Sequence, residues 1–189
     1  ATRLTFEDVK AIQETVTGVR RVAPQVFGQS QLVYGDKNWS SMVIGVTPEY
    51  ASMKNQEPMA GRFFTAEENA SRRRMVLLGQ TVLQELFGSE NPIGKTIKIN
   101  RINFQVIGIL PSLGASTFRD QDDVVIVPLM TAMRRLQGKD YLDQIDAEIT
   151  SLDKMPNAQE EIKNLIIRRH RLTPEHYDSF NIRNYADIQ

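Results

Sequence analysis

A β-hairpin is predicted by residues 95–110, which read KTIKINRINFQVIGIL. Apolar and polar residues alternate over 95–100 and again over 103–110, and a period of two is typical of strands with one buried face. The chain is expected to turn at Asn100-Arg101-Ile102. A hairpin in the middle of the chain makes β-structure part of the fold.

Helices and further strands are predicted on both sides of this hairpin. Thr65 followed by Glu68 forms a capping box that opens a short helix, and residues 75–78 form a buried strand. A helix over 80–87 ends at Gly88, and residues 124–127 form another short apolar strand. We expect the segment 111–123, rich in Ser, Gly and Asp, to be a surface loop.

The two ends of the chain show a simpler pattern of strands and amphipathic helices. Thr5 opens a helix that ends near Gly18, and two strands joined by a turn at 35–38 follow up to Val46. Helices are expected over 131–136 and 158–169. Residues 145–149 alternate as a half-exposed strand, with Asp146 and Glu148 facing solvent, and the last strand covers 180–183.

Prolines and tight turns divide the chain. Pro48, Pro58 and Gly61 mark a change of course, so a boundary is placed near Pro48. We therefore predict an α+β fold of two subdomains. One is an α/β subdomain built from residues 1–48 and 141–189, and the other is a mixed α/β subdomain inserted at 49–140.

Composition excludes several classes of protein. The chain holds no Cys, which removes thiolate nucleophiles, disulfides and structural zinc sites. Lys plus Arg and Asp plus Glu balance at 23 each, so no overall charge draws the chain onto nucleic acid. No apolar run reaches the roughly 20 residues that span a bilayer, and the first residues lack the apolar core of a signal peptide. An abrupt start and end fit a segment excised from a longer protein.

Three motifs resemble ligand sites but fail on spacing. Residues 88–96 end like a phosphate-binding loop, yet five residues separate the two glycines and Pro92 removes a donor. The acidic stretch 120–123 starts like a calcium loop but lacks its glycine and closing Glu. His170, His176 and Asp178 form at most a weak metal set. We expect a turn, a solvated loop and a cationic helix end, respectively, and no cofactor or metal.

The run Arg72-Arg73-Arg74 and two serines leave narrower alternatives. The arginines follow a short helix, where cations complement the helix dipole, and they could also form a positive rim for an acidic partner. No aromatic residues interleave them, which argues against nucleic acid. The sequences around Ser30 and Ser116 begin like nucleophile elbows but lack the closing glycine, so no catalytic residue is assigned.

An ordered series of short motifs gives the chain a family resemblance. The series is Leu4-Thr-Phe-Glu-Asp8, Val43-Ile-Gly-Val46, Gly61-Arg-Phe-Phe-Thr-Ala-Glu-Glu68, Val76-Leu-Leu-Gly79, Leu86-Phe-Gly88, Asn91-Pro-Ile-Gly-Lys95, Ile99-Asn100, Phe104-Gln-Val-Ile-Gly108, Asp120 to Asp123, Val127-Pro-Leu129, Tyr141-Leu-Asp-Gln-Ile145, Arg169-His170 and Phe180-Asn-Ile182. In order and spacing it resembles the periplasmic core region of MacB/FtsX-type ABC transporter permeases. The resemblance covers nearly the whole chain.

That resemblance implies a porter-like subdomain from the chain ends and an inserted sabre-like subdomain. It also implies an extracytoplasmic, periplasmic domain of an inner-membrane protein, placed between two transmembrane helices, with Ala1 and Gln189 close together. Its implied partners are the protein's own transmembrane helices, a cytoplasmic ATPase domain or subunit, a periplasmic adaptor and a second copy in the full-length protein. The implied role is mechanical coupling for drug or peptide efflux or lipoprotein release.

Local physics supplies a candidate contact site and two competing functions. The loop carrying Ser112, Gly114, Phe118 and Arg119 offers an aromatic ring and a cation on a surface segment, as partner sites often do. A periplasmic module that binds peptide or hydrophobic cargo would show an apolar hollow near Trp39 and Phe63. A small hydrolase would show carboxyl groups with raised pKa values in a cleft.

Overall fold

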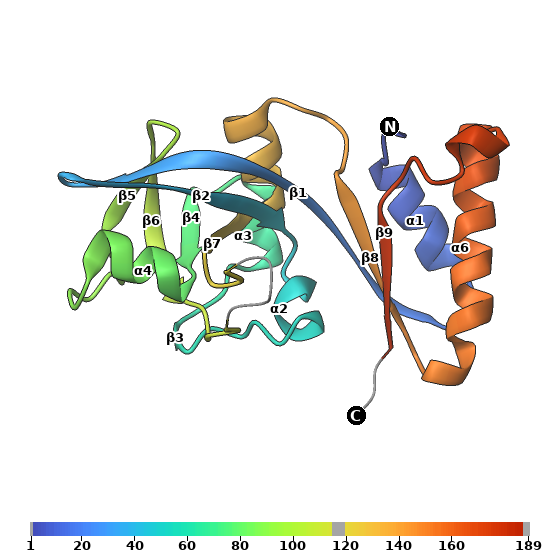
Figure 1. Ribbon diagram of the computed structural model, residues 1–189, viewed down its shortest axis with the longest axis horizontal. Coiled ribbons are helices and arrows are strands. Elements are labelled where there is room, and N and C mark those ends of the chain that lie inside the picture. The colour runs from blue at the N-terminus through green and yellow to red at the C-terminus, as the bar shows by residue number, and fades with distance from the viewer. Residues whose placement is uncertain (1, 115–119, 187–189) are drawn as a thin grey trace. The chain divides into compact units, whose positions relative to one another are not determined.

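The computed structural model describes residues 2–114 and 120–186, and the chain divides into two compact units. Unit 1 comprises residues 1–25 and 140–189, and unit 2 comprises residues 26–139. Figure 1 shows helices and strands in both units. The predicted mixture of helix and strand is confirmed, and unit 1 contains residues from both ends of the described chain.

Unit 1 is a small sheet with two helices on one side (Figure 1). The first part of β1 pairs antiparallel with β8 from Val19↔Ile149 to Gln25↔Gln144, and β9 pairs parallel with β8 from Ile145↔Ile182 to Ile149↔Ala186. Helices α1 and α6 contact one another. The elements are α1 (Phe6–Thr15), β1 (Val19–Tyr34), β8 (Gln144–Ile149), η2 (Leu152–Lys154), α6 (Met155–His170), η3 (Pro174–His176) and β9 (Ile182–Ala186).

A buried carboxylate joins the start of α1 to the end of α6. At the predicted helix start, Thr5 and Asp8 form a capping box, in which each side chain accepts a hydrogen bond from the other residue's N–H. Asp8 is fully buried, and its carboxylate also contacts Nε of Arg169 and Nε2 of His170, each at 2.7 Å. The capping group of one helix is therefore also the ion-pair partner of the other.

Strand β8 lies between β1 and β9, and all six of its residues are buried. The prediction that Asp146 and Glu148 face solvent is wrong. Asp146 accepts hydrogen bonds of 2.7 Å from the side chains of Gln25 and Gln144, and Glu148 accepts two from Arg21 at 2.8 and 2.9 Å. Polar partners on and beside the strand let these carboxylates be buried, which alternation alone does not reveal.

Unit 2 is built on strands whose pairings close into a ring. Following the hydrogen-bonded neighbours, β1 pairs with β5, β5 with β6, β6 with β4, β4 with β7, β7 with β2, and β2 with β1 again. Each of these six strands thus has a paired neighbour on both sides, although β1 meets β5, and β4 meets β7, over only two residue pairs each, and β3 adds to β6. The remaining elements are β2 (Lys37–Val46), α2 (Glu49–Met53), β3 (Ala60–Gly61), α3 (Ala66–Ala70), β4 (Met75–Leu78), α4 (Gln80–Phe87), β5 (Thr96–Ile99), β6 (Ile102–Ile109), β7 (Val124–Pro128), α5 (Leu129–Thr131) and η1 (Ala132–Gln137).

The hairpin predicted over 95–110 is present as β5 and β6. Its register runs from Thr96↔Gln105 to Ile99↔Ile102, and the turn residues Asn100 and Arg101 both have positive φ angles, 51° and 72°. Positive φ at both central residues is the backbone of a tight hairpin turn, which matches the right-handed twist of paired strands. Ile97 and Ile99 are fully buried, as the alternation predicts.

A cluster of apolar side chains fills part of unit 2. Phe63 and Phe64 pack with ring centroids 4.5 Å apart, and Phe63 lies against the buried members of the cluster. Burying a large apolar side chain stabilises a fold by about 1.5–3 kcal/mol. Those buried members are Val46, Phe64, Met75, Leu77, Ile107, Leu110 and Ile126.

The two units differ from the predicted subdomains at their first boundary. The second boundary lies between residues 139 and 140, next to the predicted one, but the first lies between residues 25 and 26. Residues 26–46 belong to strands of the ring in unit 2, so Pro48 marks the end of a hairpin rather than a change of unit. The terms porter-like and sabre-like rest only on the family resemblance.

Two expectations concern the ends of the chain. Thr2, the first described residue, hydrogen-bonds to the main chain of Ser179, just before β9 begins. Ala186, the last described residue, lies at the opposite end of β9. Ala1 and Gln189, which were expected to lie close together, are outside the described residues. Within residues 2–114 and 120–186, no helix combines the length and apolar content that a membrane span requires.

Candidate partner-contact site

The predicted contact site follows β6 at one end of unit 2. Ser112 and Gly114 are exposed, one and three residues after Pro111. Phe118 and Arg119 fall outside the described residues, so the structure places two of the four predicted site residues. These two lie together, in the first residues of the predicted surface loop.

Asp122 fixes the start of this loop to its end. The Asp122 side chain accepts hydrogen bonds from Ser112 Oγ at 2.9 Å, from Leu113 N at 2.7 Å and from Gly114 N at 3.2 Å. Asp122 itself is only 9% exposed. A carboxylate that collects several donors in a sheltered place holds their backbone firmly, because leaving any of them unpaired costs free energy.

The neighbouring aspartates attach the same segment to other elements. Asp120 accepts hydrogen bonds from Thr81 Oγ1 on α4 and from the N–H of Asp122, and these hold its pKa below the ordinary value. Asp123 Oδ1 accepts hydrogen bonds from Trp39 Nε1 at 2.9 Å and from Ser41 Oγ at 2.7 Å, both on β2. The acidic stretch predicted to be a solvated loop is thus an anchor for three segments.

The main chain at Gly79 also lies very close to the main chain of the acidic stretch. Gly79 precedes α4, and a Cβ atom at this position would lie 2.3 Å from the Asp122 oxygen and 2.6 Å from the Val124 oxygen of the main chain. Gly79 N donates a hydrogen bond of 2.8 Å to Val124 O, and Thr81 N donates one of 3.2 Å to Asp122 O. Only glycine allows β4 and α4 to come this near to the acidic stretch.

Two large apolar side chains lie exposed beside the anchored loop. Met59 is 66% exposed and Leu113 is 46% exposed. Gln80 Nε2 contacts Met59 Sδ at 3.1 Å and donates a hydrogen bond of 2.8 Å to the oxygen of Leu110, three residues before Leu113. We call Met59, Gln80, Ser112, Leu113 and Gly114 the loop-end surface. It combines exposed apolar area with hydrogen-bonding groups, as contact surfaces often do.

Sequence reasoning missed Met59 and Gln80, which belong to the loop-end surface from distant parts of the chain. Met59 N bonds to the oxygen of Ile109, so the pairing of β3 with β6 brings the methionine there. Pro58 and Gly61 predicted a turn, but nothing in the sequence indicated that β3 would pair with β6. The role of Asp122 was also missed, although its place at the end of a Ser- and Gly-rich loop was visible.

The other sequence motifs have structural roles. Lys95 N bonds to Pro92 O, and residues 96–99 continue as a strand, so the glycine-rich stretch is the turn that was predicted. His170 contacts Asp8, whereas the main chain of His176 bonds to that of Thr173. In the part of the chain that the structure describes, no three His, Asp or Glu side chains gather closely enough to hold a metal ion.

The competing functions find little support in the described residues. Trp39 donates to Asp123 and Phe63 packs on the buried cluster, so both side chains are engaged within unit 2. Burial raises the pKa of Asp8, but hydrogen bonds from Arg169, His170 and the Thr5 N–H outweigh it and leave the pKa lowered. Across residues 2–114 and 120–186, every carboxyl group with a shifted pKa is shifted downward.

Comparison with solved structures supports the fold. The extracellular domain of the noncanonical ABC-type transporter YknZ from Gram-positive bacteria matches with a TM-score of 0.77 over 90% of this chain and 86% of that one, at 20% identity. The periplasmic region of MacB from Actinobacillus actinomycetemcomitans matches with a TM-score of 0.77 over 90% of this chain and 76% of that one, also at 20% identity.

Comparison of sequences identifies the family. Macrolide export ATP-binding/permease protein MacB of Chlorobium luteolum is 50% identical over 187 residues, which are 99% of this chain and 28% of the relative. The protein of the same name from Bdellovibrio bacteriovorus is 43% identical over 188 residues, which are 99% of this chain and 29% of the relative. The chain thus spans under a third of these relatives. Residues 1–165 match the family model of the MacB-like periplasmic core domain, and the chain belongs to that family.

Proposed function

We propose that this chain is the extracytoplasmic part of an ABC transporter permease and that it couples motion of membrane helices to partners or cargo outside the cytoplasm. The observation that carries the proposal is the match of the whole chain to under a third of proteins named as macrolide export ATP-binding/permease proteins. The remaining two thirds of such a protein would supply the membrane helices and a cytoplasmic ATPase.

The contacts within each unit suit a domain that transmits force rather than one that performs chemistry. In unit 1, the buried carboxylate of Asp8 joins two helices through its contacts with Arg169 and His170. In unit 2, the strand pairings close into a ring, and Asp120, Asp122 and Asp123 bind three segments together. Closely packed units move as bodies, because packed interiors resist deformation. These four aspartates hold the structure together.

The loop-end surface is the proposed contact for an adaptor or cargo. Its start is fixed by Asp122, which orders the backbone in advance and so lowers the entropy lost on binding. Leu113 and Met59 supply exposed apolar area. Phe118 and Arg119 extend the same loop in sequence. The proposed setting is the periplasmic side of an inner membrane, where two copies of the full-length protein act together with a periplasmic adaptor.

The coupling proposal can be tested on the full-length protein in lipid nanodiscs. A nitroxide label on Leu113→Cys should change its mobility or its distance to the second copy when ATP is bound and trapped with vanadate. A variant with an inactive ATPase should show no such change and serves as the control. An ATP-dependent export activity with an unchanged label signal would contradict coupling through this domain.

The contact proposal needs a separate variant. Leu113→Asp places a charge on the loop-end surface without removing a hydrogen bond that Asp122 makes to the main chain. We expect cells that depend on this transporter to become more susceptible to macrolide, whereas Ser89→Asp, at an exposed position after α4, should have no effect. Equal susceptibility of both variants would place the contact elsewhere.

A further inference from the structure

Five exposed arginines belong to two segments of unit 2 that are far apart in sequence and hydrogen-bonded to one another. Arg72, Arg73 and Arg74 follow α3, whereas Arg134 and Arg135 lie in η1, and all five are exposed. Thr131 Oγ1 donates a hydrogen bond of 2.6 Å to Arg73 O, and Met130 N donates one of 2.9 Å to Asn69 Oδ1. These two bonds hold the segments side by side. We call the five residues the arginine face.

The two hydrogen bonds also bring the second arginine pair near the first three. Arg134 and Arg135 stand four residues after Met130 and Thr131, the two residues bonded to the α3 segment. Four residues of a helix advance by about 6 Å at most along its axis. The backbone of both segments therefore lies within reach of one extended ligand.

No carboxylate of the described residues neutralises the charges of the arginine face. Among residues 2–114 and 120–186, no ion pair or hydrogen bond of these five side chains is found, in contrast to Arg21, Arg62 and Arg169, which bind Glu148, Glu68 and Asp8. Of the carboxylates of α3, Glu68 is occupied by Arg62, which leaves Glu67 as the neighbouring negative charge. The face is a concentrated positive surface on a chain with no net charge.

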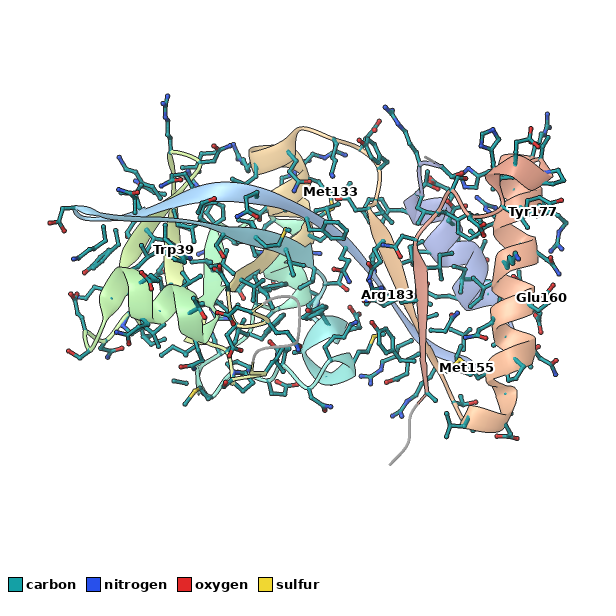
Figure 2. The ribbon with its side chains drawn as sticks, viewed as in Figure 1. Trp39, Met133, Met155, Glu160, Tyr177 and Arg183 are labelled. Carbon is teal, nitrogen blue, oxygen red and sulfur yellow. The ribbon has the colours of Figure 1, made fainter. Side chains whose placement is uncertain are left out.

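The backbone beneath these arginines is unusual at two points. Arg72 has a φ angle of 57°, a left-handed conformation that glycine or asparagine adopts at lower cost. Arg134 and Arg135 lie in a π-helix of six residues, a rare form that recurs at functional sites. Met133 of the same helix is buried (Figure 2), so one side is packed while the arginines stay exposed. Strained conformations of this kind are a reason to look for function.

We propose that the arginine face binds an acidic polypeptide segment of a protein partner. Arginine presents a planar fork that pairs with carboxylates through two hydrogen bonds, which suits Asp- and Glu-rich segments. A lipid surface fits less well, because membrane docking also uses exposed apolar side chains. The four large exposed ones in the described part, Phe6, Met59, Leu113 and Leu152, all lie outside this face.

The proposal deepens the proposed function by giving a second contact for an extracytoplasmic partner, and only its biological setting rests on that function. The binding test uses the 189-residue chain alone and does not depend on membrane topology. A failure of the proposed membrane topology and a failure of the arginine face to bind acidic peptide can therefore be told apart.

The test is a titration of the ¹⁵N-labelled chain with a peptide of about ten glutamates at low salt, followed by NMR. Chemical shift changes should concentrate in residues 66–74 and 129–137. The variant Arg72→Gln/Arg74→Gln/Arg134→Gln/Arg135→Gln should bind at least about tenfold more weakly, because several ion pairs are lost together.

A matched control removes four exposed cations elsewhere: Lys37→Gln/Lys95→Gln/Lys163→Gln/Arg168→Gln. It changes the net charge equally and should keep the affinity of the unmodified chain. Equal loss in both variants, or shifts spread over all exposed cations, would overturn the proposal. So would binding to vesicles containing phosphatidylglycerol, through the same arginines, that is tighter than binding to the peptide.

Discussion

The carboxylate of Asp8 lies 2.7 Å from Nε of Arg169, 161 residues later in the chain. Because Asp8 is fully buried and also caps α1, its loss removes an ion pair and leaves capping donors and the partly buried His170 ring without their partner. Asp8→Ala should lower the free energy of unfolding by about 2–4 kcal/mol, the sum of a lost cap and lost hydrogen bonds to a charged group. Chemical denaturation measures this. Glu14→Gln, which removes an exposed carboxylate from the same helix, should cost less than about 0.5 kcal/mol. Similar costs for both would mean that the Asp8 contacts contribute nothing.

Gly79→Ala should be poorly tolerated although the backbone at this position is ordinary. The new Cβ would fall 2.3 Å from a main-chain oxygen, and neither β4 nor the acidic stretch can move without breaking hydrogen bonds. We expect a loss of roughly 3 kcal/mol in the free energy of unfolding. The control is Gly28→Ala, whose nearest neighbour is the flexible Gln137 side chain at 3.1 Å, and its cost should stay below about 1 kcal/mol. The reverse order would contradict the packing described here.

Asp122→Ala should release the start of the contact loop. The N–H groups of Leu113 and Gly114 lose their acceptor, so their amides should exchange with deuterium at least about tenfold faster, because local opening becomes easier. Hydrogen exchange with mass spectrometry or NMR gives the rates. Asp36→Asn, in the exposed turn between β1 and β2, should leave exchange at residues 112–114 unchanged. Unchanged exchange in Asp122→Ala would show that the loop is held by something else.

The pair Arg62–Glu68 should make stability depend on pH in acid. Two hydrogen bonds of 2.8 Å from Arg62 lower the pKa of Glu68 from 4.5 to about 2. A carboxyl group whose pKa is lowered by folding stabilises the folded protein at pH values above the pKa of the unfolded chain. For Glu68 this contribution is lost as the pH falls from about 4.5 to about 2. Glu68→Gln should thus be less stable than the unmodified protein at pH 6, by at most about 1 kcal/mol, and equal at pH 2. Glu67→Gln should follow the unmodified curve. A difference that persists at pH 2 would assign the effect to packing.

Local signals in the sequence predicted the elements of the fold well. The capping boxes at Thr5 and Thr65 and the hairpin at 95–110 are all present. These features depend on residues a few positions apart. The strand ring was not predicted, because it needs long-range pairings such as Met42↔Val124 that no local pattern encodes.

The burial of charged side chains was also not predicted from the sequence. Asp146 and Glu148 alternate with apolar residues as solvent-facing residues would, yet partners from β1 allow them to be buried. The start of the loop predicted over 111–123 is exposed at residues 112–114, as expected, but the aspartates that anchor it were interpreted as solvated. In both cases the hydrogen-bond donors come from distant segments, and only the three-dimensional structure brings them together.

The most direct test of the account is the membrane topology of the complete gene product. This chain has no cysteine, so Ser89→Cys, at an exposed position of unit 2, introduces one reporter once cysteines elsewhere in the full-length protein are replaced. A membrane-impermeant maleimide should label it in cells whose inner membrane is intact. Labelling that occurs only after this membrane is broken would place the domain in the cytoplasm and contradict its role as the extracytoplasmic part of a transporter.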